Sequence, residues 1–184
     1  EIPASLFIGT QAKNIVYSDD IVSIGANAFS NCGITTADIG ENVVTIGENA
    51  FSYSSITSLN IPDSVQHVGT GAFAACNSLV TARLGMGLTE IADGLFSSCT
   101  ALKTIVLSGD VTKIGTSAFY GCSSLTNINI PAAVTEIGAN AFEGCESLKS
   151  VVIPDGVTTI KTGTFKNCTS LESITIPDSV TTIE

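Results

Sequence analysis

Six cysteines are the side chains of this 184-residue sequence with the greatest capacity for chemistry: Cys32, Cys76, Cys99, Cys122, Cys145 and Cys168. An even number of cysteines can form disulfides, and clustered thiolates can hold zinc. Here each cysteine stands alone, three residues after a phenylalanine, and Ser54 takes the same place once. The sequence has no C-x-x-C pair and no histidine cluster. We therefore predict a column of buried free thiols, without disulfides or metal.

Other catalytic groups are sparse. His67 is the single histidine, and no carboxylate or cysteine recurs in phase with it. The sequence contains no glycine-rich phosphate loop, no nucleophile elbow and no H-E-x-x-H pattern. We therefore expect a protein that is not an enzyme and that needs no cofactor.

Acidic side chains recur at one place in the sequence pattern: Asp19, Glu41, Asp63, Asp155 and Asp178. Stacked carboxylates could hold calcium, but Met86, Gly109 and Ala132 interrupt this column. A solvated acidic rim is the favoured interpretation. Seventeen acidic residues against seven basic ones give a net charge of −10, which argues against nucleic acid as a partner.

The elements that must position these groups follow from a repeat. Seven phenylalanines are separated by 22 or 23 residues, namely Phe29, Phe51, Phe73, Phe96, Phe119, Phe142 and Phe165. Isoleucine, valine and leucine columns keep the same period. A fixed period of this length is typical of a solenoid, in which one short unit stacks on the next. We predict a single, mainly β solenoid of about seven units.

Each unit predicts the same local structure. In residues 148–153, Val151 and Ile153 alternate with polar residues as in a short strand, and Pro154 ends it. Residues 157–160 are a second extended stretch. Apolar residues at positions i, i+1 and i+4, as in Ala141, Phe142 and Cys145, predict a short helical turn. A glycine column precedes that turn, where the chain must change direction, although Ala92 and Lys161 interrupt it.

The ends of the chain depart from this register. Residues 15–17 (Ile-Val-Tyr) match the strand columns, but we assign no phenylalanine or cysteine to the preceding turn. Residues 1–23 are therefore expected to form a degenerate capping unit and residues 24–184 the solenoid, which we expect to continue in the parent protein. No apolar run is long enough to span a membrane, and no signal peptide is visible in this stretch.

The unit Leu148-x-x-Val151-x-Ile153-Pro154-x-x-Val157-x-x-Ile160, followed by Gly-x-x-Ala-Phe-x-x-Cys, resembles the BspA-like class of leucine-rich repeats. The resemblance covers residues 15–184. It implies a right-handed, curved solenoid with parallel strands. It also implies a bacterial or protozoan protein, extracellular or on the cell surface, that serves adhesion and protein binding.

Solenoids of this kind usually bind on the concave face of the strands. The candidate binding residues there are Thr81, Arg83, Thr104, Val106, Asn127 and Asn129. Arg83 and Val106 stand out from a surface of Ser, Thr and Asn, and Arg83 is expected to be free to pair with an acidic ligand group. A protein ligand from a host or matrix is the first hypothesis. A glycan-binding accessory module and a structural spacer are the alternatives.

Overall fold

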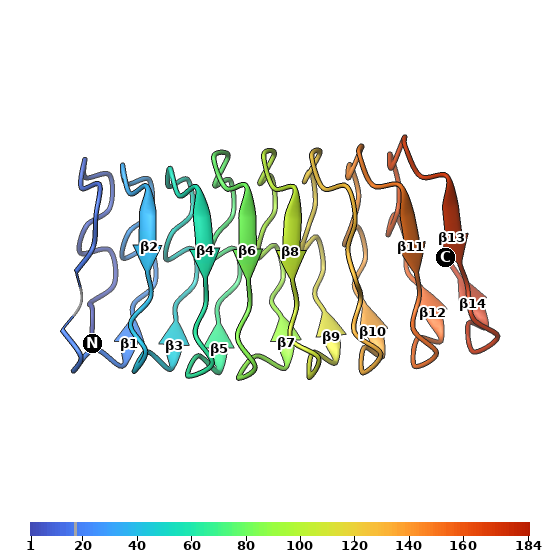
Figure 1. Cartoon of the computed structure of the whole chain (residues 1–184), viewed down its shortest axis with the longest axis horizontal. Coiled ribbons are helices and arrows are strands. Elements are labelled where there is room, and N and C mark those ends of the chain that lie inside the picture. The colour runs from blue at the N-terminus through green and yellow to red at the C-terminus, as the bar shows by residue number, and fades with distance from the viewer. Residues whose placement is uncertain (17) are drawn as a thin grey trace.

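The computed structural model describes residues 1–16 and 18–184, which form one row of stacked coils (Figure 1). Most coils contribute a three-residue strand on one face, and a two-residue strand lies on the next face. The longer strands are β2 (Thr36–Asp38), β4 (Ser58–Asn60), β6 (Thr81–Arg83), β8 (Thr104–Val106), β11 (Ser150–Val152) and β13 (Ser173–Thr175). The two-residue strands are β1 (Ser23–Ile24), β3 (Thr45–Ile46), β5 (His67–Val68), β7 (Glu90–Ile91), β9 (Lys113–Ile114), β10 (Glu136–Ile137), β12 (Thr159–Ile160) and β14 (Thr182–Ile183).

All strand pairs of the described chain are parallel, and each residue pairs with the one 22 or 23 positions later, as Thr81 does with Thr104. In the longer strands up to β11 the middle residue is buried and its two neighbours are exposed, because successive side chains of a strand point to opposite faces. The predicted parallel solenoid with about seven repeats is confirmed.

Stacked phenylalanines form the centre of the core. Ring centroids of successive coils lie 5.2–5.9 Å apart from Phe29 to Phe165, with nearly parallel planes. Phe7 extends this stack, 5.2 Å from Phe29, and Thr10 lies where a cysteine lies in later coils, 3.5 Å from the Cys32 sulfur. The expectation that the first unit lacks the phenylalanine was wrong. Tyr17, part of the strand expected at 15–17, lies outside the described residues.

The predicted helical turn is instead a run of tight turns, and no helix occurs in the described residues. These turns form one face of the row, which we call the turn face. Its backbone N–H groups donate alternately to a carbonyl of their own coil and to one of the next coil. Ala50 N donates to Gly47 O in its own coil, whereas Phe51 N donates to Ala72 O. Asn49 and Tyr53 have positive φ angles of 52° and 59°, which prevent the turns from continuing as a helix. The turn face is therefore a third hydrogen-bonded ladder between coils.

The glycine column allows close approach of neighbouring coils, and it does not supply a left-handed backbone. None of its five glycines (Gly25, Gly47, Gly69, Gly115 and Gly138) has a positive φ. A Cβ atom on Gly69 would lie 2.5 Å from the backbone nitrogen of Glu48 in the preceding coil.

Strand pairing is lost where a side chain occupies this column. Ala92 follows β7, which does not pair with β5, and Lys161 follows β12, which does not pair with β10. Glu184 stands in the same column after β14, which does pair with β12. A side chain at this position therefore weakens pairing inside the row and is tolerated at the last residue.

This explanation predicts the effect of adding a single methyl group. A Cβ on Gly138 would lie 2.7 Å from the Cα of Thr116, so we expect Gly138→Ala to destabilise the protein by about 1–3 kcal/mol. Gly109→Ala is the matched control, because nothing lies within 4 Å of its Cβ position, and its effect should stay within about 0.5 kcal/mol. Urea unfolding curves measure both. Equal effects of the two substitutions would contradict the close-approach explanation.

Candidate binding surface

The outward-facing residues of the longer strands and of residues 127–129 form what we call the strand face. Four of the predicted binding residues lie side by side on it. Thr81 and Arg83 of β6 pair in register with Thr104 and Val106 of β8, and all four are exposed. Val106 is 60% exposed, an unusual value for a valine within a sheet. The structure therefore brings these four residues together as the sequence indicated.

Arg83 contacts the preceding coil and is not free. Its Nη1 donates a hydrogen bond of 3.3 Å to Asn60 Oδ1, and its Nη2 lies 3.9 Å from Asp63 Oδ1. Both charged side chains remain about half exposed, so this pair contributes little to stability. The contacts hold the guanidinium over the strand face with part of its donors still open to solvent.

Asn127 and Asn129 are exposed as predicted, but residues 127–129 do not form a strand. The sheet is interrupted on both sides of them: β2, β4, β6 and β8 form one sheet, and β11 pairs only with β13. Elsewhere Leu84 N donates to Val106 O at 2.9 Å. The equivalent bond from Ile130 N to the β11 residue Val152 is absent from the described structure. The strand prediction was wrong here.

Strand pairing between the coil of residues 127–137 and the next coil is missing on two faces. Residues 127–130 do not pair with β11. Between the same two coils β10 does not pair with β12, and Lys161, which follows β12, stands in the place of a glycine. The side chain of Lys161 crosses this step, and its Nζ lies 2.6 Å from Glu136 Oε1. The crowded column offers a physical reason why β10 and β12 do not pair.

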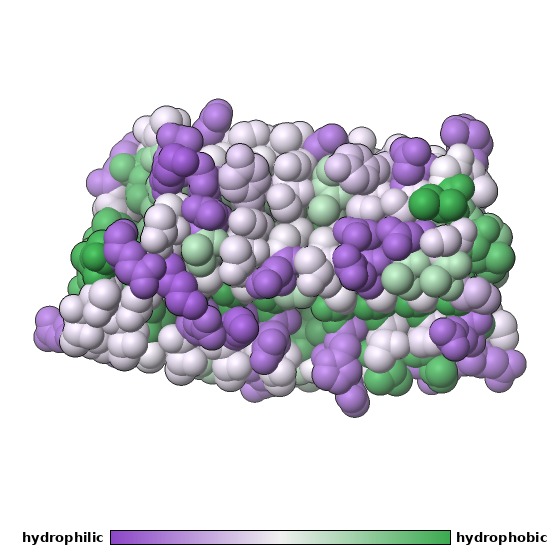
Figure 2. Space-filling model, turned by 180° about the vertical axis from the view of Figure 1, so that it is seen from behind, coloured by the Kyte–Doolittle hydropathy of each residue, from purple (hydrophilic) through white to green (hydrophobic). Residues whose placement is uncertain are grey.

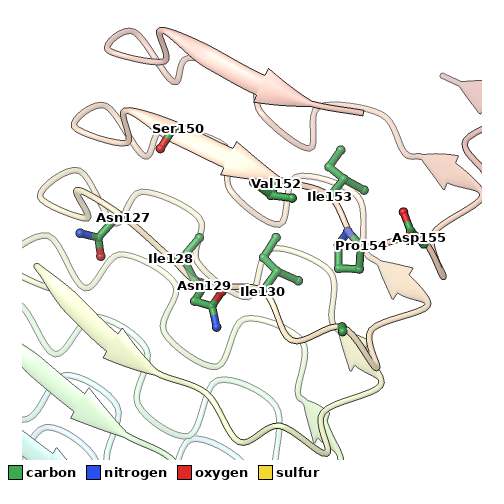
Figure 3. Close-up of a pocket in the computed structure, with 10 residues that line it drawn as sticks. Asn127, Ile128, Asn129, Ile130, Ser150, Val152, Ile153, Pro154 and Asp155 are labelled. Atoms are coloured by element: carbon green, nitrogen blue, oxygen red, sulfur yellow. The ribbon is translucent and has the colours of Figure 1, made fainter. Parts of the chain in front are cut away.

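A groove of about 610 Å³ opens between residues 127–132 and β11 with the turn that follows it (Figure 3). Its lining combines Ile128, Ile130, Val152, Ile153 and Pro154 with Asn127, Asn129, Ala132, Ser150 and Asp155. The sequence pattern marked Val152 as outward-facing and Asp155 as part of the acidic rim. It gave no sign that they share a groove with the two asparagines, because the groove depends on the interrupted sheet.

The cysteines form the predicted column of free thiols. All six are unbonded to one another, and only Cys168 in the last coil is partly exposed. Each thiol donates to the carbonyl of a phenylalanine in the preceding coil, as Cys99 does to Phe73 O at 3.1 Å, and Ser54 makes the same bond to Phe29 O at 2.9 Å. Burial raises the pKa of Cys76 to about 12. These thiols are therefore structural hydrogen-bond donors and poor nucleophiles.

Two of the remaining polar candidates are an exposed histidine and a carboxylate in a structural contact. His67 is exposed on β5. Asp63 accepts a 2.9 Å hydrogen bond from the backbone of Met86, which places this carboxylate in a structural contact between coils. The described residues contain no group of three or more His, Cys, Asp or Glu side chains arranged to hold a metal ion. No helix of the described chain is long and apolar enough to cross a membrane.

Figure 2 shows the face behind the view of Figure 1, which is mostly hydrophilic and neutral, with apolar side chains at the two ends of the row and in a band along its lower part. In the C-terminal coil, Ile174, Ile176 and Ile183 are exposed.

These features define a leucine-rich-repeat solenoid. A family model described as "BspA type Leucine rich repeat region (6 copies)" matches residues 1–125 and 89–184. The chain belongs to the BspA-type leucine-rich repeat family. A search of curated proteins found no match.

Two solved structures are similar to this chain. A leucine rich cell surface protein from Faecalibacterium prausnitzii A2-165 has 30% sequence identity and a TM-score of 0.66, and the match covers 86% of this chain and 52% of that one. The Treponema (T. pallidum) Leucine Rich Repeat protein has 24% identity and a TM-score of 0.58 over 88% of this chain and 68% of that one, a similarity of fold. This chain thus spans about half of the Faecalibacterium protein.

Proposed function

We propose that this chain is a non-catalytic repeat scaffold that binds a protein partner through its strand face. The observation that carries the proposal is the juxtaposition of Arg83 and Val106 in register on adjacent strands. An exposed guanidinium beside an exposed apolar side chain is a common centre of protein interfaces. Membership of a repeat family whose scaffolds are generally non-catalytic supports the same function.

We further propose that the protein acts outside the cell or on its surface, by similarity to the Faecalibacterium cell surface protein. Adhesion to a host or matrix protein is the specific role we propose. Residues 1–23 would cap the core and residues 24–184 would be part of a longer solenoid.

Partner binding should depend on Arg83. Arg83→Ala removes the only arginine and is expected to weaken affinity for a protein ligand by at least about 1 kcal/mol, roughly fivefold. Lys166→Ala on the turn face is the charge-matched control and should leave affinity unchanged. Lys166 pairs with Glu143 at 2.8 Å, so a melting curve must first show that this variant is folded. A ligand that responds to Lys166 and ignores Arg83 would place the interface on the turn face.

The polar side chains of the strand face support glycan binding as the second candidate function. Ser58, Thr81, Thr104 and Ser150 are exposed hydroxyl groups on successive long strands. A matrix-protein panel and a glycan array, probed with the same labelled protein, separate the two functions. Binding to neither would favour the structural spacer.

A further inference from the structure

A second groove lies on the turn face, outside the strand face. Its volume is about 540 Å³, which is within the range of roughly 300–1,000 Å³ that ligand sites occupy. It is lined by residues of four successive coils, from Thr100 to Thr169. None of its lining residues belongs to a strand or to the candidate binding residues of the strand face.

Two successive glycines form the floor of this groove. The residue two positions after the core phenylalanine has a positive φ in all seven coils from Phe29 to Phe165. Gly121 and Gly144 hold this position in adjacent coils, and both line the groove. The other five coils carry a side chain there, namely Asn31, Tyr53, Ala75, Ser98 and Asn167. The turn face is therefore hollowed where two side chains in succession are missing.

Backbone hydrogen bonds hold the floor in place. Gly121 N donates to Glu143 O at 2.7 Å, and Gly144 N donates to Lys166 O at 2.8 Å. The carbonyls of the two glycines accept bonds from Ser123 N and Glu146 N. The groove is thus preformed, which lowers the ordering cost of binding, and a ligand must be held by side chains because these backbone groups are already paired.

An exposed tyrosine forms part of one wall. The position directly after the core phenylalanine holds a small residue in the first four coils from Phe29 onwards: Ser30, Ser52, Ala74 and Ser97. In the next coil this position holds Tyr120, which lines the groove and is 42% exposed. Tyr120 is the aromatic member of the lining, and the strand face has no aromatic side chain in the corresponding positions.

Two carboxylates lie beside the glycine floor. The side chain of Glu143 is only 12% exposed, and its Oε1 lies 2.8 Å from the Nζ of Lys166. A carboxylate has two oxygens with about four acceptor sites, so Glu143 is held in place and can still accept further bonds. Glu146 is exposed and makes no salt bridge in the part of the chain that the structure describes. Asn167 and three hydroxyl side chains, those of Thr100, Ser123 and Thr169, complete the polar lining.

This set of groups matches the chemistry of a sugar. The face of an aromatic ring carries partial negative charge, which attracts the C–H groups on one face of a pyranose. Carboxylates accept strong hydrogen bonds from sugar hydroxyls. No Val, Leu, Ile, Met or Phe lines the groove, which argues against apolar peptide side chains. No Lys or Arg lines it either, and the chain has a net charge of −10, so acidic sugars are disfavoured.

We propose that this groove binds a neutral oligosaccharide, with one pyranose ring packed on Tyr120 and hydroxyl groups donated to Glu143 and Glu146. An elongated groove across four coils suits several linked sugars better than a single one. The site lies apart from the hydroxyl groups of the strand face and does not depend on the proposed protein-binding function.

A glycan array that carries neutral and sialylated oligosaccharides identifies the ligand, and calorimetry then measures the strongest neutral one. Binding should be confined to neutral glycans. Gly144→Asn should weaken it at least about tenfold, because the new side chain fills the floor. Asn31 and Asn167 already adopt the same positive φ, so this variant should fold, and a melting curve checks it. Unchanged affinity of a folded Gly144→Asn variant overturns the proposal.

Two tyrosine variants test the wall. Tyr120→Ala should also weaken the glycan at least about tenfold. Tyr53→Ala is the matched control, because Tyr53 is 67% exposed on the same turn face and lies outside the groove lining, and it should change affinity less than about twofold. Equal effects of the two variants, or no neutral glycan bound at about 1 mM, would overturn the proposal.

The remaining comparisons separate other binding modes. Thr104→Ala and Arg83→Ala on the strand face should leave glycan affinity unchanged, since neither residue lines the groove. A glycan that responds to Thr104 and ignores Tyr120 binds on the strand face and removes this inference, while a protein partner that depends on Arg83 is unaffected by either outcome. The peptide acetyl-Lys-Gly-Lys-Gly-Lys-amide should not displace the glycan. Displacement by this peptide would mean that the carboxylates select a cationic ligand, against the proposal.

Discussion

Raising the pH above 9 is expected to unfold this protein within one to two pH units. Burial holds the pKa of Cys76, Cys99, Cys122 and Cys145 above the ordinary thiol value of 9.0, with that of Cys76 near 12. Above pH 9 the unfolded chain releases these protons while the folded chain retains them. Stability is therefore fully present below pH 9 and falls as the pH rises toward the folded pKa.

The size of this effect follows from the number of thiols. Each contributes a slope of up to about 1.4 kcal/mol per pH unit, and four together reach about 5 kcal/mol per pH unit, comparable to the whole stability of many domains. Urea unfolding at pH 8, 9, 10 and 11 measures the slope. The double variant Cys99→Ser/Cys122→Ser is the control, because Ser54 already makes the same hydrogen bond and does not titrate here. The slope should fall by about half, and an unchanged slope would mean that other groups cause the effect.

Truncating one ring in the middle of the phenylalanine stack should be the most damaging single substitution. Phe119 is fully buried, and its ring lies 5.8 Å from that of Phe96 and 5.4 Å from that of Phe142. Phe119→Ala removes both stacking contacts and leaves a cavity, so we expect a loss of about 3–5 kcal/mol in the free energy of unfolding.

Thr175→Ala is the control for this prediction. Thr175 is exposed on β13, and its backbone carbonyl accepts the bond from Ile153 N whatever its side chain. Its substitution should stay within about 0.5 kcal/mol of the parent. Similar denaturation midpoints for the two variants would contradict the division of the columns into core and surface.

The regular part of the fold could be predicted because each core column repeats at 22 or 23 residues. The phenylalanine column, the cysteine column and the alternation around Val151 define the inside of the coils. Because equivalent residues of successive coils must stack on one another, these columns determine the arrangement of the core. The turn face was mistaken for helix because apolar spacing alone does not reveal the positive φ angles at Asn49 and Tyr53. Phe7 obeyed the period and was overlooked, since its coil carries Thr10 in place of the cysteine.

The candidate site was only partly predictable. The register that joins Arg83 to Val106 follows from the repeat, whereas the interruption at residues 127–130 does not. The sequence Asn127-Ile128-Asn129-Ile130-Pro131 closely matches 58–62 (Ser-Leu-Asn-Ile-Pro), which begins with the paired strand β4. The difference arises between coils, because residues 127–130 pair with neither β8 nor β11. Sequence patterns within one unit do not report such a contact.

The missing pairing between β10 and β12 also affects how the row of coils would respond to a mechanical force. Repeat arrays are usually treated as chains of equal nearest-neighbour couplings. Here one coupling lacks strand pairing on two of its three faces and depends mainly on the turn face, where Phe142 N donates to Thr164 O at 2.9 Å and Gly144 N donates to Lys166 O at 2.8 Å. Those bonds and the Phe142–Phe165 ring contact lie on one face, where they would act as a hinge line. A pull along the axis would therefore part the row at this step first, with the coils on either side moving as rigid blocks.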